Sequence, residues 1–227
     1  MSNIGSEGYL TSMDKTGKEA DPASTAYWEE YYKANPHPFN PSAFALEVAR
    51  WLGTSGTMIE LGCGNGRDAV FLSQRIQGTL LAIDQCVHEV ERLNLEQAHE
   101  RLHFLAADFS TYRPTDPIQY AYSRWTMHAI DEEAEDRTLD WLTRSVRNTG
   151  IFFVEARSVR DDLYGKGEHV GGHAYLTDHY RRFMDPEVFT QKLRTRGWTI
   201  LDSVESRGFA VHQDDDPVIV RVIAQKP

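Results

Sequence analysis

The sequence predicts an α/β domain in which helices cover both faces of a largely parallel sheet. Two observations predict it. From about residue 57 onward, short apolar runs alternate with segments of helical periodicity. Several of the apolar runs end at a Gly or an Asp, as strands do when they lead into a loop. The last two runs have no helix between them, which predicts a terminal antiparallel hairpin.

The alternation predicts seven strands and the helices between them. The strands are expected at 57–61, 79–83, 102–106, 118–123, 151–156, 198–204 and 218–224. The helices are expected at 43–52, 68–76, 87–98, 132–147 and 186–196. Ser42 and Asp131 are placed to cap two of these helices, and Gly197 to end another. Residues 1–24 have no periodicity and are expected to form a flexible tail before a single domain at 25–227.

Composition narrows the function classes. Of 227 residues, 24 are Lys or Arg and 34 are Asp or Glu, which gives a net charge of −10 and disfavours binding to nucleic acid. The apolar runs are too short to span a bilayer, and the N-terminus has no apolar signal stretch. Cys63 and Cys86 are the only cysteines, so a disulfide framework is excluded. We expect a cytoplasmic protein without a metal, either a monomer or a homodimer.

The strongest local pattern is the segment Glu60-Leu-Gly62-Cys-Gly64-Asn-Gly66 between the first predicted strand and helix. Glycines at alternate positions let a loop turn tightly and approach a ligand at a helix N-terminus. Asp84, at the end of the next strand, can accept hydrogen bonds from a ribose. The spacing departs from the nicotinamide fingerprint G-x-G-x-x-G, because Arg67 stands where the third Gly belongs. A simple glycine-rich turn is the alternative.

This segment resembles motif I of the class I S-adenosylmethionine-dependent methyltransferases, E/D-x-G-x-G-x-G. The resemblance implies a Rossmann-like sheet in the order 3-2-1-4-5-7-6 with the last strand antiparallel, S-adenosyl-L-methionine as cofactor and S-adenosyl-L-homocysteine as product. It also implies roles along the strand ends, with the glycine loop at the methionine part of the cofactor, Asp84 at the ribose and Asp108 and Phe109 at the adenine. The cofactor-binding residues implied in this core are Glu60, Gly62, Cys63, Gly64, Asp84, Gln85, Asp108, Phe109 and Ser123.

Two further segments resemble parts of this family. Trp28 and Tyr32, followed by Phe39, are similar to the N-terminal lid of thiopurine- and tellurite-type methyltransferases, which implies a lid at 25–52 and cofactor contact. Aromatic residues four apart share a helix face, but ordinary core packing is the alternative. After the fourth strand, Ser123, Arg124 and Trp125 stand where the family lines the substrate cavity. The family often has Asp or Asn there with an aromatic residue nearby.

The segment at 157–183 is rich in Gly, His, Tyr and Arg and follows the fifth strand, where ligands bind in open α/β sheets. We expect a substrate loop that receives a small polar, anionic acceptor. The predicted substrate-binding residues are Arg124, Trp125, Arg157, Tyr175, Arg181 and Arg182. The alternative is a solvated loop whose arginines pair with its own acidic residues. His169 and His173 are four apart, but the Gly-Gly between them argues against a metal site.

The predicted reaction is methyl transfer from S-adenosylmethionine to oxygen or nitrogen of a sugar, a phosphorylated metabolite or a natural-product intermediate. A hydroxyl acceptor benefits from a base, and His128, His173 and His179 are the candidate catalytic residues. An amine or thiol acceptor needs none. The alternatives are a thiol- or metalloid-detoxifying methyltransferase, a non-catalytic cofactor-binding partner protein, and a dinucleotide oxidoreductase.

Overall fold

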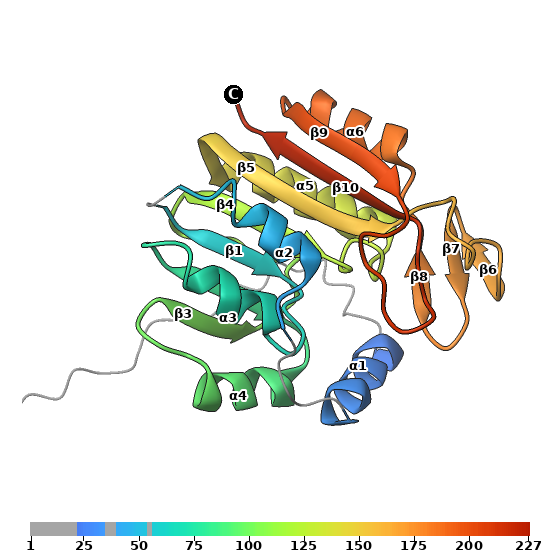
Figure 1. Ribbon diagram of the computed structural model, residues 1–227, viewed down its shortest axis with the longest axis horizontal. Helices are drawn as coiled ribbons and strands as arrows, with labels where there is room; N and C mark the ends of the chain where they lie inside the picture. The colour runs from blue at the N-terminus through green and yellow to red at the C-terminus, as the bar shows by residue number, and fades with distance from the viewer. Residues whose placement is uncertain (1–21, 35–39, 54–55) are drawn as a thin grey trace, which may run out of the picture.

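The computed structural model describes residues 22–34, 40–53 and 56–227 of the chain (Figure 1). Helix α1 (Pro22–Ala34) begins at Pro22, three residues before the predicted domain boundary at 25. Proline is well suited to the first turn of a helix, because its missing N–H would have no partner there. The rest of the predicted tail, 1–21, and Phe39 of the predicted lid lie outside the described residues.

A seven-stranded sheet forms the centre of the domain, in the order β3-β2-β1-β4-β5-β10-β9. Its strands are β1 (Met58–Leu61), β2 (Leu80–Asp84), β3 (Leu102–Ala106), β4 (Ile118–Arg124), β5 (Val146–Arg157), β9 (Thr199–Ser206) and β10 (Ile219–Gln225). The first five are parallel, and β10 runs antiparallel to both β5 and β9. The predicted fold class and strand order are confirmed, as is the antiparallel last strand.

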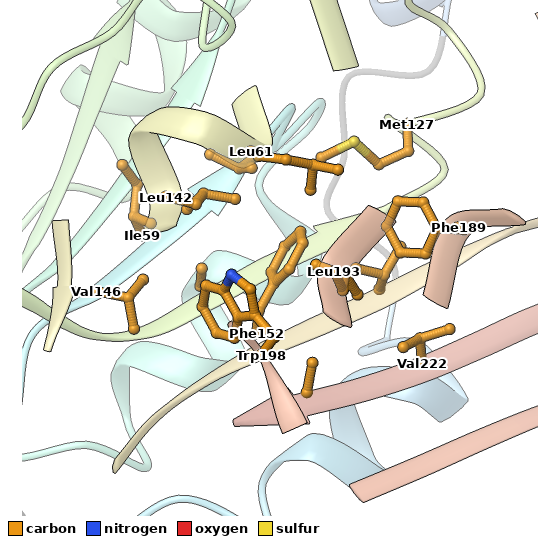
Figure 2. Packing of buried hydrophobic residues seen from close by; sticks show 14 of the residues in the cluster. Ile59, Leu61, Met127, Leu142, Val146, Phe152, Phe189, Leu193, Trp198 and Val222 are labelled. Atoms are coloured by element: carbon orange, nitrogen blue, oxygen red, sulfur yellow. The ribbon is translucent and has the colours of Figure 1, made fainter. Parts of the chain in front are cut away.

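Helices cover both faces of this sheet (Figure 1). They are α2 (Ala43–Val48), α3 (Arg67–Ser73), α4 (Val87–Glu96), α5 (Glu132–Ser145) and α6 (Pro186–Thr195). Successive residues of β5 enter different hydrophobic clusters: Phe152 packs with residues of α5 and α6 (Figure 2), and Phe153 with residues of α2, α3 and α4. Burial on both faces explains why β5 reads as a continuous apolar run.

The two largest differences between predicted and observed boundaries are in α2 and β5. Helix α2 ends at Val48 instead of residue 52, because Arg50 N–H and Trp51 N–H bond three residues back, to Glu47 and Val48 carbonyls, and tighten the turn. Trp51 is 39% exposed, so its helical spacing did not indicate burial. Strand β5 begins at Val146, five residues earlier than predicted, and its pairing with β4 includes Val146 opposite Ile118.

The predicted substrate loop at 157–183 contains a small antiparallel sheet of β6 (Glu168–Gly171), β7 (Ala174–Leu176) and β8 (Tyr180–Arg182). Its strands are three or four residues long and mostly polar, which is too little for a recognisable alternation. The sheet follows the carboxyl end of β5 (Figure 1), and Arg182 N–H donates to His128 O at 2.7 Å. The segment is therefore a separate small sheet that lies beyond the carboxyl end of β5.

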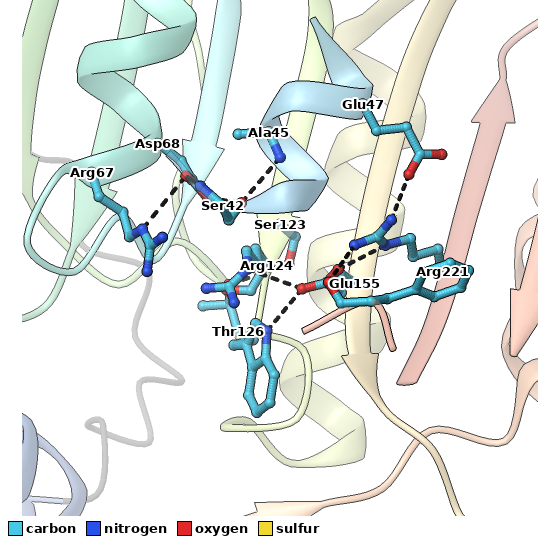
Figure 3. Close-up of polar contacts among 12 residues, drawn as sticks. Ser42, Ala45, Glu47, Arg67, Asp68, Ser123, Arg124, Thr126, Glu155 and Arg221 are labelled. Carbon is cyan, nitrogen blue, oxygen red and sulfur yellow. Dashed lines mark hydrogen bonds and ion pairs between the residues drawn. The ribbon is translucent and has the colours of Figure 1, made fainter. Parts of the chain in front are cut away.

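A buried hydrogen-bond cluster fixes α2 against the sheet. Asp68, at 2% exposure, accepts from Ser42 N–H at 2.8 Å, Ser42 Oγ at 2.7 Å and Tyr122 Oη at 2.7 Å. Ser42 Oγ also accepts from Ala45 N–H, which confirms Ser42 as the N-cap of α2 (Figure 3). One carboxylate thus connects α3, the cap of α2 and β4.

We expect Asp68→Ala to lower the free energy of unfolding by about 2–4 kcal/mol, because three buried donors lose their acceptor. Urea unfolding followed by far-UV circular dichroism measures this loss. Exposed Asp116, replaced in the same way, is the control and should cost under about 0.5 kcal/mol. Equal losses in the two variants would contradict the role of Asp68.

Candidate functional site

The glycine loop leaves β1 at the edge where the carboxyl ends of all five parallel strands meet. Gly62, Gly64 and Gly66 have φ of 70°, 52° and 77°, a region that favours glycine. Gly62 N–H and Cys63 N–H both donate to Ile83 O of β2, at 2.8 and 2.9 Å. The loop therefore folds back over the end of β2.

The three glycines are needed for different close approaches. A Cβ on Gly62 would lie 2.0 Å from Thr126 Cγ2, and one on Gly66 would lie 2.8 Å from Leu93 Cδ2. These two glycines are required by the protein's own packing. A Cβ on Gly64 would lie 2.5 Å from Tyr32 Oη of α1, so only Gly64 faces the segment predicted to be a lid.

Asp84 lies at the end of β2 and holds the glycine loop. Its carboxylate accepts from Gly64 N–H at 2.8 Å and from Cys86 N–H at 3.0 Å. Burial raises the pKa of Asp84, and these backbone donors oppose the increase. Neighbouring Gln85 accepts from Thr25 Oγ1 of α1 at 3.3 Å. The predicted ribose-binding residue therefore lies directly beside the glycine loop and under α1.

Glu60 is a buried carboxylate with an unsatisfied oxygen. It is 4% exposed, and its Oε2 has no hydrogen-bond partner within the described residues. Burial raises its pKa well above the ordinary value, and repulsion from Asp68 and Asp84 adds to this, while Arg124 opposes it. An unsatisfied buried acceptor is costly, and a cationic ligand group would satisfy it.

Helix α1 lies beyond the carboxyl ends of the parallel strands, next to α4 (Figure 1). Trp28 and Tyr32 stack at a centroid distance of 6.0 Å. Burial, followed by repulsion from Asp84, raises the pKa of Tyr32 well above the ordinary value. Nearer the helix N-terminus, Tyr27 Oη donates to Asp178 Oδ2 at 3.1 Å. The helix thus reaches from the glycine loop to the small sheet.

Two of the three candidate catalytic histidines come together near α1. His128 is 3% exposed, its Nδ1 has no partner within the described residues, and its ring packs edge-on to Trp125 at 5.3 Å. Burial lowers the pKa of His128 well below 6.5, and the positive charge of Arg157 and the ring of His179 lower it further. The His179 ring lies 4.5 Å from Tyr27 and 5.1 Å from Trp28.

His179 also faces Asp178, whose Oδ2 lies 3.1 Å from His179 Nδ1. Burial lowers the pKa of His179, with help from Arg181, and outweighs the opposite effect of Asp178. His173 is located elsewhere: it is exposed, and its Nδ1 lies 2.9 Å from Tyr164 Oη. Tyr175 joins this outer group, 5.2 Å from Tyr164. The structure therefore groups His128 and His179 but places His173 and Tyr175 in a separate aromatic cluster.

The predicted substrate-binding arginines differ in how many donors remain available. Arg157 is buried, and it uses Nη1 on both oxygens of Asp161 and Nη2 on Asp215. Arg182 donates to Ile130 O, Met127 O and Glu135. Both arginines are paired within the protein, but not as in a solvated loop, because Arg157 is buried and Asp215 and Glu135 lie outside 157–183.

Arg181 and Arg124 have more hydrogen-bond donors available than Arg157 and Arg182. Arg181 Nη1 donates to Asp178 Oδ1 at 2.8 Å and to Thr177 Oγ1 at 2.5 Å. Arg124 donates only through Nε, to Glu155 Oε1 at 2.9 Å, among the described residues. Trp125 has φ of 61°, a left-handed conformation that is uncommon for an aromatic residue and is found at functional sites.

Several predicted cofactor residues have local structural explanations. Asp108 accepts from Ser110 N–H and Oγ at 2.8 and 2.9 Å. Phe109 is 4% exposed within the hydrophobic core, which leaves little of its ring for an adenine. Ser123 is fully buried and donates to Thr126 Oγ1 at 3.3 Å. Cys63, another predicted cofactor residue, is also buried, and burial raises the pKa of its thiol well above the ordinary value.

The sequence analysis missed a chain of buried charges across the sheet. Glu155 at the end of β5 lies between Arg124 of β4 and Arg221 of β10, and Arg221 reaches Glu47 of α2 (Figure 3). A signal was available, because Glu155 and Arg221 interrupt otherwise apolar strand sequences. Charged residues are almost never buried unless they are paired.

Part of the sequence is similar to a known protein family. Residues 58–150 match the family model described as a methyltransferase domain. No curated protein matches the sequence. The matched residues include the glycine loop, so the match agrees with the resemblance to methyltransferases that motif I indicates.

Solved structures share the fold at low identity. The [4+2]-cyclase SpnF has 15% identity, with 90% of this chain and 93% of that chain covered and a TM-score of 0.67. The glycopeptide N-methyltransferase MtfA has 18% identity, coverage of 83% and 97%, and a TM-score of 0.64. A TehB-like SAM-dependent methyltransferase from Corynebacterium glutamicum has 14% identity, coverage of 91% and 100%, and a TM-score of 0.62.

The described residues form neither a membrane-spanning helix nor a cluster of metal-ligating side chains. None of the helices they form is long and apolar enough to pass through a membrane. They also contain no group of three or more His, Cys, Asp or Glu side chains able to hold a metal ion.

We expect Gly62→Ala to destabilise the protein more than Gly165→Ala. Both positions have positive φ, 70° and 81°, so each alanine pays about 1–2 kcal/mol for the left-handed conformation. Only at Gly62 does the new Cβ also overlap a neighbour, Thr126, while Gly165 has open space. The overlap adds about 1–3 kcal/mol.

Urea unfolding of the two variants measures this difference. Gly165→Ala serves as the matched control for backbone strain alone. Losses that agree within error would show that the approach of Thr126 to the glycine loop is not tight.

Proposed function

We propose that this chain, whose residues 58–150 match a methyltransferase domain, transfers the methyl group of S-adenosylmethionine to a small polar, anionic acceptor bound beneath α1. The observation that carries the proposal is the loop of this domain. There Glu60, which is buried and has one oxygen without a partner among the described residues, lies at the start of a glycine loop at the carboxyl edge of the sheet. Asp84, the predicted ribose-binding residue, accepts a hydrogen bond from that loop. We further propose that it acts in the cytoplasm, as a monomer or homodimer, on a small molecule and not on nucleic acid.

The residues present fit the proposed cofactor. Glu60 Oε2 would accept from the ammonium of its methionine part, and Asp84 would accept from the ribose hydroxyls while it still holds Gly64 N–H. Tyr32 already touches Gly64, so a ligand that approaches this glycine has to displace the Tyr32 side chain. Helix α1 is therefore proposed to be a movable cover over the cofactor.

When bound, S-adenosylmethionine supplies a methyl group on a positively charged sulfur that is ready for in-line displacement. The protein has to align the acceptor, exclude water and, for a hydroxyl acceptor, take up a proton. His128 and His179 are the candidates for the last step. Because burial lowers the pKa of both, they are neutral near pH 7 and can accept a hydrogen bond from the hydroxyl of the methyl acceptor.

An anionic acceptor is supported by the local charge. The chain carries a net charge of −10, yet Arg124 and Arg181, which have more donors available than Arg157, both act electrostatically on His128. A planar guanidinium matches the oxygens of a carboxylate or phosphate. Sugar phosphates and carboxylated natural-product intermediates, methylated at oxygen or nitrogen, are the acceptors that we propose first.

The alternative acceptors are thiols and metalloids, which the resemblance of Trp28 and Tyr32 to the lid of thiopurine- and tellurite-type methyltransferases suggests. A further alternative is a non-catalytic cofactor-binding protein. A panel of sugar phosphates, hydroxy acids, amines, small thiols and tellurite, assayed with a labelled methyl donor, separates the three. Turnover confined to thiols or tellurite would reject the anionic acceptor, and no turnover despite tight cofactor binding would reject catalysis.

We expect Asp84→Ala to weaken S-adenosylhomocysteine binding by about 5- to 150-fold, equivalent to about 1–3 kcal/mol, through loss of ribose hydrogen bonds. Isothermal titration calorimetry on the purified protein measures the affinity. Asp116→Ala, on the surface, is the control and should bind as the wild type does. Unchanged affinity in Asp84→Ala would remove the ribose role.

For a hydroxyl acceptor found in the panel, we expect His128→Ala to lower kcat by about 100-fold or more, with cofactor affinity within threefold of wild type. The reason is that His128 presents a buried, neutral imidazole whose Nδ1 has no protein partner among the described residues. Steady-state kinetics with calorimetry measures both quantities. The control His103→Ala changes an exposed histidine on β3. A normal kcat in His128→Ala would exclude His128 as the base.

A further inference from the structure

Glu155 is buried at the end of β5 and is surrounded by donors. It is 1% exposed, and its Oε1 accepts from both Arg124 Nε at 2.9 Å and Trp125 Nε1 at 2.8 Å. Its main-chain carbonyl also accepts from Trp125 N–H at 2.8 Å. One residue therefore fixes both the backbone and the indole of Trp125 and the direction of the Arg124 guanidinium (Figure 3).

The second carboxylate oxygen of Glu155 is paired with an arginine inside the fold. Oε2 accepts from Arg221 Nε at 2.8 Å, and Arg221 Nη1 donates to Glu47 Oε2 at 2.5 Å. The Arg221 guanidinium lies 4.4 Å from the Phe209 ring centroid and 5.0 Å from that of Phe44. Alternating charges thus run from Glu47 to Arg124, and the two inner residues, Glu155 and Arg221, have partners on both sides.

Arg124 is the open end of this chain. Its side chain is 23% exposed, and its two Nη atoms make no hydrogen bond to the described residues. The guanidinium lies 5.3 Å from the Trp125 ring centroid, and the same indole is packed against His128. Glu155 thereby leaves two N–H-bearing nitrogens of Arg124 free beside a candidate catalytic histidine.

We propose that Glu155 is the positioning residue of the acceptor site: it holds Arg124 and Trp125 so that Arg124 binds the carboxylate or phosphate of the acceptor. This inference rests on the proposed function, since it assigns the anionic group of that acceptor to one guanidinium. Glu155 touches neither substrate nor cofactor and acts through Arg124. A planar guanidinium held at Nε presents its remaining donors in a fixed direction, as recognition of an oxyanion requires.

Inorganic phosphate, titrated into the full chain saturated with S-adenosylhomocysteine, tests the proposal. The variants are Glu155→Gln, Arg124→Ala, the double variant, and Glu47→Gln as the control at the far end of the same charge chain. Phosphate binding is followed by the indole ¹⁵N–¹H resonance of Trp125, assigned with Trp125→Phe. Thermal unfolding checks that each variant is folded.

We expect saturable phosphate binding to wild type and Glu47→Gln, with affinity about tenfold lower in Glu155→Gln and Arg124→Ala. The double variant should bind as Arg124→Ala does, because a residue that acts only through Arg124 has no effect once Arg124 is gone. If Glu155 only stabilised the fold, the double variant would instead show the sum of the losses in Glu155→Gln and Arg124→Ala.

Four results would overturn the proposal. Wild-type affinity in Glu155→Gln would remove its role, as would an equal loss in Glu47→Gln. A loss confined to S-adenosylhomocysteine affinity would place Arg124 at the cofactor. Absence of phosphate binding in the wild type would reject the anion subsite while leaving the methyltransferase proposal intact, since cofactor affinity is measured separately.

Discussion

The contact between Thr126 and Gly62 is the constraint on which the rest of the site depends. Thr126 Oγ1 donates to Leu61 O at 2.6 Å, and its methyl group occupies the space that a side chain at position 62 would need. This contact joins the loop after β1 to the segment after β4. Because His128 lies two residues further along, the glycine loop and the candidate base are held in one rigid unit.

Around this unit the protein buries charges that its fold has to neutralise. Asp84 and Asp68 are satisfied by backbone and hydroxyl donors, and Glu155 by two guanidinium groups and an indole. Glu60 differs, because one of its oxygens has no partner among the described residues. Burying an unsatisfied carboxylate costs stability unless something binds it. The exception therefore indicates where a ligand group belongs.

The comparison of sequence with structure shows what each kind of pattern can predict. Strand 102–106 has the predicted bounds, and Asp131 caps α5 as expected, since both features depend on local sequence. The small sheet at 168–182 and the pairing of Arg157 with Asp215 escaped prediction. These features depend on which distant segments meet, and neither apolar periodicity nor a motif encodes that. A better sequence-based signal was Glu155, a charge inside an apolar strand.

Helix α1 connects the two halves of the proposed site. Tyr32 touches the glycine loop, and one turn earlier Trp28 packs against His179, while Tyr27 bonds to Asp178. Movement of α1 away from Gly64 would also break the contacts of Tyr27 and Trp28 with Asp178 and His179. Under the proposed function, cofactor entry and acceptor binding are therefore coupled through one helix. The coupling follows from the positions of these aromatic side chains, because each half of the site contributes a contact that the same helix has to satisfy.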